Sequence, residues 1–529
     1  SQSVTRVAPG AWAPLRHPVF RNLWLAQLGS NIGSWMQTVG AQWFLLEQTH
    51  SSALVAWVQS ASLLPVLLFS LVAGVLADSV DRRRLLLVTT VGSTVAAALL
   101  CVLSGVGFLA PWSLLLMTFV LGSLTAFTNP AWQAIQPDLV SPAEIPAAAS
   151  LSSVTVNGAR AVGPALAGAL VSLGGPTLVF AINAVSFVGV LGVLLWWREP
   201  LRRPALGRER FLPAMAAGLR YVRAAPGVRR ILLRSALFAM PASVLWALLP
   251  SVAQSNLGLG SSGYGLLLGI LGVGAVLGVV VMPVLRRRLS SSWILAGSAL
   301  AYAVGLAAPV TRSLPVVAVA FLVTGLAWIA TLTTLNASLQ LTLAGWVRAR
   351  GMSVYLLVFM GGQGVASFAW GIAAHYLGPM TCFLVGAGLL VLVAASVPAL
   401  PLRPETGTLD RTIVALTSTS PTLVFEPDPT DGPVVVALTY VVRPGTEADF
   451  VAAMRRLERS RRRTSASSWR LDRSGEHADT YREAFVVPSW GEYTRSTAAR
   501  WTAYDRDVLE AATAFAVTTP TEEHFFPAD

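Results

Sequence analysis

The sequence predicts an all-α polytopic membrane protein with twelve transmembrane helices in two six-helix halves, followed by a small cytosolic α+β domain. Of the 529 residues, 54% are hydrophobic and only 12% are charged, and the mean hydropathy is +0.62. This composition is too apolar for a soluble chain of this length. The apolar residues also recur in runs of about 20, the length that crosses a bilayer as a helix.

Six of these runs precede an arginine-rich segment and six follow it. The N-terminal half, at 1–197, has predicted spans at 19–46, 53–77, 85–108, 112–135, 147–173 and 177–197. The C-terminal half, at 231–402, has predicted spans at 231–254, 264–285, 293–310, 314–341, 351–376 and 380–400. The segment between the halves, at 198–230, is predicted to be a cytoplasmic central loop.

Arginine clusters indicate the orientation of the spans, because cytoplasmic loops near span ends keep an excess of positive charge. Arg82–Arg84, Arg286–Arg288 and the central loop fall on one side if there are twelve spans. We therefore expect both termini and the C-terminal domain on the cytoplasmic side of a bacterial inner membrane. The amphipathic stretch 211–230 is predicted to lie along the inner membrane surface and to tether the halves.

Several classes of function are excluded. The net charge of +12 comes from arginines in short loops between apolar runs, with no basic module bearing base-stacking aromatics, so nucleic acid is not an expected partner. Cys101 and Cys382 lie inside apolar runs and give neither a disulfide framework nor a metal site. The sequence has no G-x-x-x-x-G-K-S/T phosphate loop, so direct use of ATP is not expected. We predict no cofactor, no metal and no catalytic residues.

A charged segment, GVLADSVDRRR at 74–84, separates the second and third apolar runs. An acidic residue at a span end is costly to place without a partner. We predict that the segment is a cytoplasmic gate, a charge network that is closed in one state and broken in the other. A solvated positive-inside loop is the alternative. The residues of the predicted gate are Gly74, Asp78, Asp81, Arg82, Arg83 and Arg84.

Part of this segment recurs in the second half of the sequence. Gly74 and Arg82–Arg84 return 204 residues later as Gly278 and Arg286–Arg288, whereas the two acids do not return. Parallel repeats of six spans place a substrate between the halves near mid-membrane, where transport follows from rocking of one half against the other.

The charged segment resembles the signature between the second and third spans of the major facilitator superfamily. Gly74, Asp78, Arg82 and Arg83 match that signature, and Asp81 stands where the family has glycine. Together with LLEQT, NPAWQAIQPDLV and VNGARAVGPALAG, the segment is similar to the branch that contains the enterobactin exporter and other transmembrane secretion and drug-efflux transporters. The resemblance covers about residues 11–402 and implies the major facilitator fold and a secondary active exporter, commonly driven by proton antiport.

Two charged residues are candidates for contact with the substrate or for coupling. Arg160 is placed near the middle of the fifth span, where a charge must face a cavity or a partner. It could bind an anionic or acceptor-rich substrate through its planar donor fork, and a structural tie to backbone carbonyls or Asn157 is the alternative. Glu47, near the outer end of the first span, is the candidate proton carrier, with a hydrated residue at the membrane rim as the alternative.

Uncharged candidates complete the predicted site. Polar amides that could line the substrate path are Gln27, Asn31, Asn129, Gln133, Asn157, Asn336, Gln340 and Gln363. Tryptophans that could either contact an aromatic substrate or anchor span ends at the interface are Trp24, Trp35, Trp43, Trp57 and Trp328. Predicted helix-packing and bending positions of the fifth span are Gly158, Gly163, Pro164 and Gly168.

The tail of the chain has a different pattern. A Pro-, Thr- and Ser-rich linker at 403–432 is followed by a predicted soluble domain at 433–529. VVVALTYVV alternates as a strand, and Thr446 with Asp449 predicts a capping box for a helix through Arg463. A hairpin around Gly475, helical patterning over 490–515 and a closing HFFPA complete a β-α-β-β-α-β order, typical of a ferredoxin-like fold.

This tail is similar to the domains of antibiotic-biosynthesis monooxygenases, although a shared fold does not confer chemistry. His477 and His524 are expected at its surface rather than in a catalytic site. The tail could regulate or assemble the exporter as a homodimerisation module, or it could be an oxygenase-like enzyme tethered to it.

The leading hypothesis is therefore a proton-driven exporter of a siderophore or related secondary metabolite. A broad-specificity multidrug efflux transporter is the alternative in the same class. The expected partners are a small-molecule substrate of anionic or aromatic character, protons and the lipid bilayer.

Overall fold

The computed structural model describes residues 10, 12–198, 210–344, 346–402, 414–416 and 423–528. The chain forms two compact units. The first comprises residues 1–211, 234–334 and 356–401, and the second comprises 212–233, 335–355 and 402–529.

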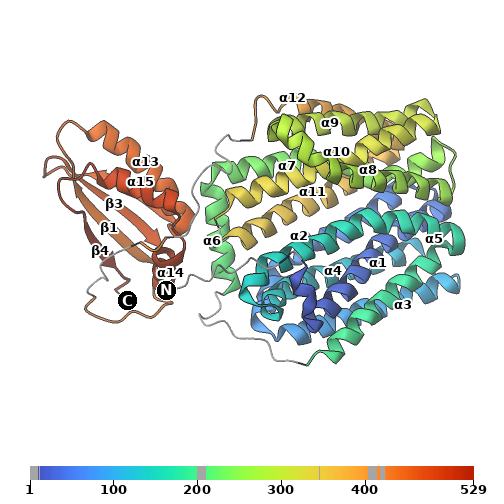
Figure 1. Ribbon diagram of the computed structural model, residues 1–529, viewed down its shortest axis with the longest axis horizontal. Helices are drawn as coiled ribbons and strands as arrows, with labels where there is room; N and C mark the ends of the chain where they lie inside the picture. Colours follow the sequence, from blue (N-terminus) through green and yellow to red (C-terminus); the bar gives the residue numbers. More distant parts are fainter. Residues whose placement is uncertain are drawn as a thin grey trace. The chain divides into compact units, whose positions relative to one another are not determined.

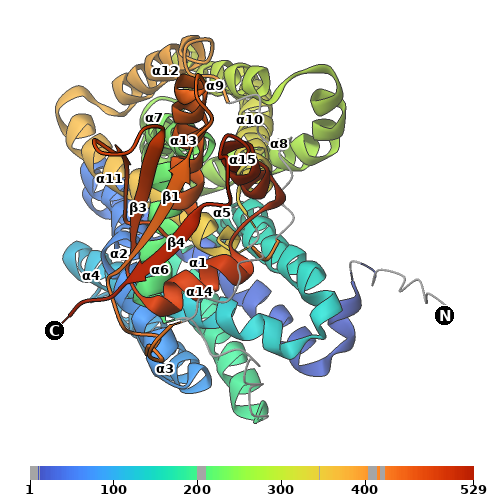
Figure 2. The ribbon, with the colours of Figure 1, turned by 90° about the vertical axis from the view of Figure 1, so that its left-hand side faces the viewer.

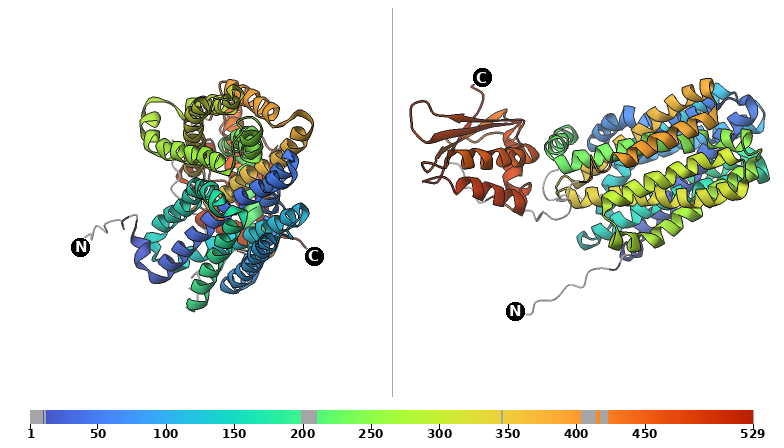
Figure 3. Two further views of the ribbon diagram at one scale, coloured as in Figure 1. Left: turned by 90° about the vertical axis from the view of Figure 1, so that its right-hand side faces the viewer. Right: turned by 90° about the horizontal axis from the view of Figure 1, so that it is seen from above.

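The first unit is built from long apolar helices that run alongside one another (Figures 1 and 3). Those of the N-terminal half are α1 (Pro18–Thr49), α2 (Ser52–Ser79), α3 (Arg82–Gly105), α4 (Pro111–Ile135) and α5 (Ile145–Trp196). Those of the C-terminal half are α7 (Pro226–Ser255), α8 (Ser261–Arg288), α9 (Ser291–Ala307), α10 (Leu314–Thr342), α11 (Arg348–Leu377) and α12 (Pro379–Ala395).

Each of the twelve predicted spans corresponds to a helical segment. Among the described residues, nine helices are long and apolar enough to cross a membrane, and the 52-residue α5 contains the fifth and sixth predicted spans. Its helix is broken at Gly175, which has φ 70° and precedes Pro176. Glycine adopts this left-handed backbone without the steric cost of a Cβ atom. The first predicted span corresponds to α1, and the last corresponds to α12, which is shorter.

Side-chain caps fix where the first helices meet. The Ser51 hydroxyl accepts a hydrogen bond from the Leu54 amide and starts α2, and the Asp81 carboxylate accepts one from the Arg83 amide and starts α3. Both are preferred N-cap residues. Only Val80 and Asp81 separate α2 from α3, so Asp81 serves the turn where a glycine was expected from the family signature.

The second unit contains the helix α6 (Phe211–Ala224), residues 335–355 at the facing ends of α10 and α11, and the C-terminal domain. The amphipathic stretch predicted in the central loop thus forms a helix. The C-terminal domain consists of β1 (Val434–Val441), α13 (Glu447–Thr464), β2 (Ser468–Arg473), β3 (Thr480–Val487), α14 (Trp490–Ala499), α15 (Ala503–Thr513) and β4 (Thr521–Phe525).

The C-terminal sheet has the strand order β2-β3-β1-β4 with every neighbouring pair antiparallel, and β1 lies between β3 and β4 in Figure 2. This is the order expected of a ferredoxin-like fold, and the predicted hairpin around Gly475 joins β2 to β3. Its core contains apolar side chains from both the sheet and the helices, including Val436, Tyr440, Phe450 and Leu457.

Two local predictions for this domain were wrong. Thr446 precedes α13 but makes no capping hydrogen bond, because its hydroxyl donates instead to the Arg443 carbonyl at 2.6 Å. The helical patterning over 490–515 divides into α14 and α15, because Thr502 and Asp505 form a capping box that starts a second helix.

Candidate functional site

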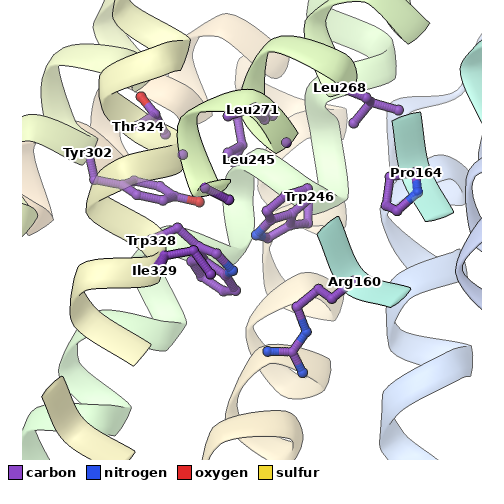
Figure 4. A pocket seen from close by; sticks show the side chains of 13 residues that line it. Arg160, Pro164, Leu245, Trp246, Leu268, Leu271, Tyr302, Thr324, Trp328 and Ile329 are labelled. Carbon is purple, nitrogen blue, oxygen red and sulfur yellow. The ribbon is translucent and has the colours of Figure 1, made fainter. Parts of the chain in front are cut away.

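A cavity lies inside the first unit. Arg160 and Pro164 of α5 contribute to its wall from the N-terminal half, and the C-terminal half supplies the rest. Figure 4 shows Arg160 extending from α5 and the aromatic side chains of the other half gathered near it. The lining residues from α7 to α10 are Leu245, Trp246, Leu268, Leu271, Gly272, Ala275, Tyr302, Thr324, Gly325, Trp328 and Ile329.

An aromatic cluster forms one wall of the cavity. The Trp328 ring lies 5.5 Å from that of Trp246 and 6.1 Å from that of Tyr302, between ring centroids. The Tyr302 hydroxyl donates to the Ala242 carbonyl at 2.9 Å, which fixes the ring. The Nε1 atom of Trp328 is buried and makes no hydrogen bond within the described part of the chain, and that of Trp246 is buried beside the Tyr302 hydroxyl. A ligand with acceptor atoms could satisfy such donors while its apolar part stacks on the indoles.

Arg160 lies between this cavity and a smaller one. Its guanidinium carbon is 5.4 Å from the centre of the Trp35 ring, a cation–π distance. Trp35 lines the second cavity together with the amides Gln42 and Gln59. Both cavities share Pro164, Trp246 and Leu268. The two hollows therefore adjoin, with the guanidinium as the charged group close to both.

The two halves are closed against each other at the end of the bundle where α1 ends. A Cβ atom added at Gly168 of α5 would lie 2.0 Å from the Cα of Gly265 in α8, so the backbones touch as they do at small-residue contacts between membrane helices. Trp43 stacks on Tyr264 with ring centroids 5.4 Å apart. Gln42 donates through Nε2 to the Trp246 carbonyl at 3.0 Å.

Glu47 is connected to this closed end. Its carboxylate accepts a hydrogen bond of 2.7 Å from Trp43 Nε1, and the carboxylate side chain is exposed. The predicted carboxylate of Glu47 therefore contacts Trp43, one of the two rings that stack across the halves. Glu47 lines neither cavity.

The charged segment at 74–84 has three arginines in three different environments. Arg82 is 8% exposed and donates through Nε to the Ala77 carbonyl at 3.3 Å. Arg83 donates to the carbonyls of Trp197 and Leu194, at 2.6 and 2.8 Å, and so binds the C-terminal end of α5. Arg84 is exposed and lies 3.9 Å from Asp81. The side chain of Asp78 lies outside the described residues.

None of the predicted amides whose side chains the structure describes lines either cavity. Gln27 and Asn31 are half-buried, Gln363 is buried, and Asn129 and Gln133 are exposed. Asn336 and Gln340 belong to the second unit, and the side chain of Asn157 lies outside the described residues. Among the predicted tryptophans, Trp35 and Trp328 do line a cavity.

Sequence reasoning missed Trp246, Tyr302 and Gln59. Trp246 and Tyr302 lie within apolar spans, where no periodicity separates a cavity-facing ring from a lipid-facing one. Gln59 was a detectable signal, because it is a polar amide and the seventh residue of the predicted span at 53–77.

A family model described as "Transmembrane secretion effector" matches residues 9–524 of the chain. The chain belongs to the transmembrane secretion effector family. The match includes the C-terminal domain as well as the helical bundle, so the tail is part of the region this family model covers.

Curated relatives of the chain are transporters. The chain is 29% identical to the staphyloferrin A transporter of Staphylococcus aureus over 254 residues, which are 48% of this chain and 64% of the relative. It is 28% identical to the enterobactin exporter EntS of Salmonella choleraesuis over 50% of this chain and 63% of the relative. It is 26% identical to macrolide efflux protein A of Streptococcus pyogenes over 44% and 58%. The matched stretch thus spans about three fifths of each relative.

Solved transporter structures share the fold of the secretion effector. A bacterial homologue of the human lysosomal transporter Spinster, in an inward-facing and unoccupied conformation, has a TM-score of 0.59 at 18% identity. The match covers 72% of this chain and 96% of that structure. The nucleoside transporter NupG has a TM-score of 0.58 at 13% identity, over 72% and 100%.

The C-terminal domain of the secretion effector contains a buried polar network. Glu483 is fully buried and accepts hydrogen bonds from Arg461 Nε at 2.8 Å, the Tyr440 hydroxyl at 2.8 Å and Trp469 Nε1 at 3.1 Å. Burial and the Glu483 charge raise the pKa of Tyr440 well above its ordinary value. Both oxygens of the carboxylate accept hydrogen bonds, and a buried charge needs such partners.

A second polar cluster lies at the edge strand β4. The expectation of a surface position is wrong for His524, whose side chain is 6% exposed and lies 3.0 Å from Glu522, because its ring packs against Trp490 and Tyr493. His477 is exposed, as expected. Hydrogen bonding from His524 holds the pKa of Glu522 below its ordinary value of 4.5.

Proposed function

We propose that this protein is a secondary active exporter that carries an aromatic or acceptor-rich small molecule, such as a siderophore, across the bacterial inner membrane. The observation that carries the proposal is the cavity between Arg160 of the N-terminal half and the Trp246, Tyr302 and Trp328 cluster of the C-terminal half. A site built from both halves is where a transporter of two six-helix repeats binds its cargo.

The chemistry of the cavity favours this class of substrate. Catecholate and carboxylate siderophores present several oxygen acceptors, which a guanidinium and two indole N–H groups can bind. The aromatic wall offers stacking surface to a ring-containing cargo. The staphyloferrin and enterobactin transporters among the relatives support the choice.

Transport is proposed to occur by alternating access. With the predicted orientation, both termini and the C-terminal domain are cytoplasmic, and the contacts of Gly168 with Gly265 and of Trp43 with Tyr264 close the periplasmic side. The halves at 1–197 and 231–402 would then rock about the cavity. Residues Gly74 to Arg84 are proposed as the cytoplasmic gate, with Asp78 as its acidic member.

Protons are the proposed driving ion, and Glu47 is the proposed carrier. Its hydrogen bond with Trp43 relates the carboxylate to a ring that stacks across the halves. Protonation removes the negative charge that strengthens this bond, and so would loosen the contact that closes the periplasmic side.

Everted membrane vesicles containing the full chain test the proposal. Enterobactin, staphyloferrin A and a macrolide are offered separately, and uptake and a fluorescent proton-gradient signal are recorded together. We expect uptake of a siderophore that stops when the gradient is dissipated. Arg160→Ala should abolish uptake at normal membrane levels, whereas Arg287→Ala, an exposed arginine outside the cavity, should not. No movement of any compound would reject the exporter assignment, and normal uptake by Arg160→Ala would reject the proposed site.

Multidrug efflux is the second candidate. The wall of the cavity is mostly apolar, and the relative from Streptococcus pyogenes is a macrolide efflux protein. This candidate predicts uptake of the macrolide with little dependence on Arg160, because an apolar cargo gains little from the guanidinium.

A further inference from the structure

Three segments distant in sequence meet around one carboxylate of the second unit. Glu492 of α14 is 6% exposed and accepts hydrogen bonds from Arg500, which is 1% exposed, with a shortest distance of 2.6 Å. The guanidinium of Arg220, from α6, lies 3.5 Å from the same Glu492 oxygen and is 17% exposed. One buried carboxylate of the C-terminal domain is therefore shared between an arginine of its own domain and an arginine of α6.

The connection between α10 and α11 completes this contact. The Arg500 guanidinium carbon lies 4.6 Å from the centre of the Trp346 ring. Trp346 meets Tyr221 of α6 edge-to-face, with centroids 5.6 Å apart and an interplanar angle of 86°. The Tyr221 hydroxyl accepts a hydrogen bond from the Ala344 amide at 3.3 Å.

The burial of these charges makes the contact specific. An exposed ion pair contributes little, but Glu492 and Arg500 are nearly excluded from water, and a desolvated charge is costly without its partners. If the domain left α6, Arg500 would keep Glu492 but lose the Trp346 ring, and Arg220 would lose its carboxylate. Glu492 and Arg500, which pair within the C-terminal domain, thus also contact α6 and the connection between α10 and α11.

We propose that the C-terminal domain is an intramolecular clamp, whose docking surface of Glu492 and Arg500 holds α6 against the connection between α10 and α11. Its partner is this chain's own cytoplasmic loops. Because 335–355 includes the ends of two helices that continue into the first unit, the clamp constrains the loops on which movement of the C-terminal half depends. This role goes beyond export and does not require a particular cargo.

Hydrogen exchange measured by mass spectrometry on the full chain in lipid nanodiscs tests the clamp. Arg220→Ala and Trp346→Ala should each raise the exchange rate of amides in 211–224 by about tenfold or more, as expected when a docked helix opens locally. Arg220→Lys and Trp346→Phe, which keep the charge and the ring, should retain most of the protection. The matched control is Arg223→Ala, on the same helix with an exposed side chain, and should not change the rate.

Amides of β1 and β3 in the same samples report whether the domain itself stays folded. Faster exchange at 211–224 with unchanged β1 and β3 supports the clamp. An exchange rate at 211–224 that is equal in the parent, Arg220→Ala and Trp346→Ala would overturn the clamp. The clamp would also be overturned if Arg223→Ala raised this exchange rate as much as Arg220→Ala does. Exchange does not measure transport, so failure of the clamp and failure of the exporter assignment are distinguishable.

Discussion

Trp43 of α1 stacks on Tyr264 of α8 with an interplanar angle of 14°. The two rings come from different halves of the predicted repeat, and the Trp43 indole also donates to Glu47. One aromatic contact therefore lies next to both the closed end of the bundle and the proposed proton carrier.

Removing this stack should weaken the closed state. An aromatic pair contributes about 0.5–1.5 kcal/mol beyond the area it buries, so Tyr264→Ala should lower the melting temperature of the purified protein by a few degrees and reduce uptake of the proposed cargo. Tyr376→Ala, at a position 80% exposed, is the control. Equal melting temperatures for parent and Tyr264→Ala would show that the stack does not stabilise this state.

The contact of Gly168 with Gly265 should tolerate no side chain. Gly168→Ala places a methyl group 2.0 Å from the Gly265 Cα, which must push α5 from α8, so we expect loss of uptake and a lower melting temperature. Gly158→Ala lies on the same helix with no atom within 4 Å of the added methyl and should be neutral or stabilising by up to about 1 kcal/mol. Similar behaviour of the two variants would contradict the close packing.

Arg83 should matter more than Arg84. Arg83→Ala leaves the carbonyls of Trp197 and Leu194 without their donor, at about 1–3 kcal/mol for buried acceptors, and should reduce both uptake and the melting temperature. Arg84→Ala removes an exposed charge and should change neither by much. If the variants are equivalent, the segment acts through its net charge, as a positive-inside loop would.

The C-terminal domain should depend on Glu483. Glu483→Gln leaves Arg461 buried without its counter-charge, and breaking such a pair costs about 3–5 kcal/mol. We expect loss of hydrogen-exchange protection across β1 and β3. Asp472→Asn, in an exposed pair with Arg470, should leave protection unchanged. Retained protection in Glu483→Gln would mean that the neutral amide satisfies the same donors.

Acid should destabilise the β4 edge through Glu522. Because its pKa is depressed in the folded chain, its contribution to stability is complete above the ordinary value of 4.5 and is lost as the pH falls through the folded value. Exchange of β4 amides should therefore accelerate below about pH 4.5, and Glu522→Gln should remove this acceleration. An unchanged pH profile in Glu522→Gln would assign the acid sensitivity to another group.

The sequence was sufficient for the helices, because bilayer thickness fixes their length and loop charge marks their ends. It was also sufficient for the break in α5, because the apolar runs at 147–173 and 177–197 are separated where Gly175 interrupts the helix. Arg160 was detectable since a charge within an apolar run is rare, whereas Trp246 and Tyr302 were not, because aromatic residues in a span look alike whether they face lipid or a cavity. Asp81 was an ordinary N-cap signal, obscured by comparison with a glycine in the family signature.

The two-residue connection between α2 and α3 has a practical consequence. Because Asp81 caps α3 directly after α2 ends, only two residues can accommodate a displacement of one helix relative to the other at this end. Val80, which is 43% exposed and precedes the cap, is therefore a suitable attachment point for a spectroscopic probe. A distance label there would report movement of the connection between the two helices during the transport cycle without entering the cavity.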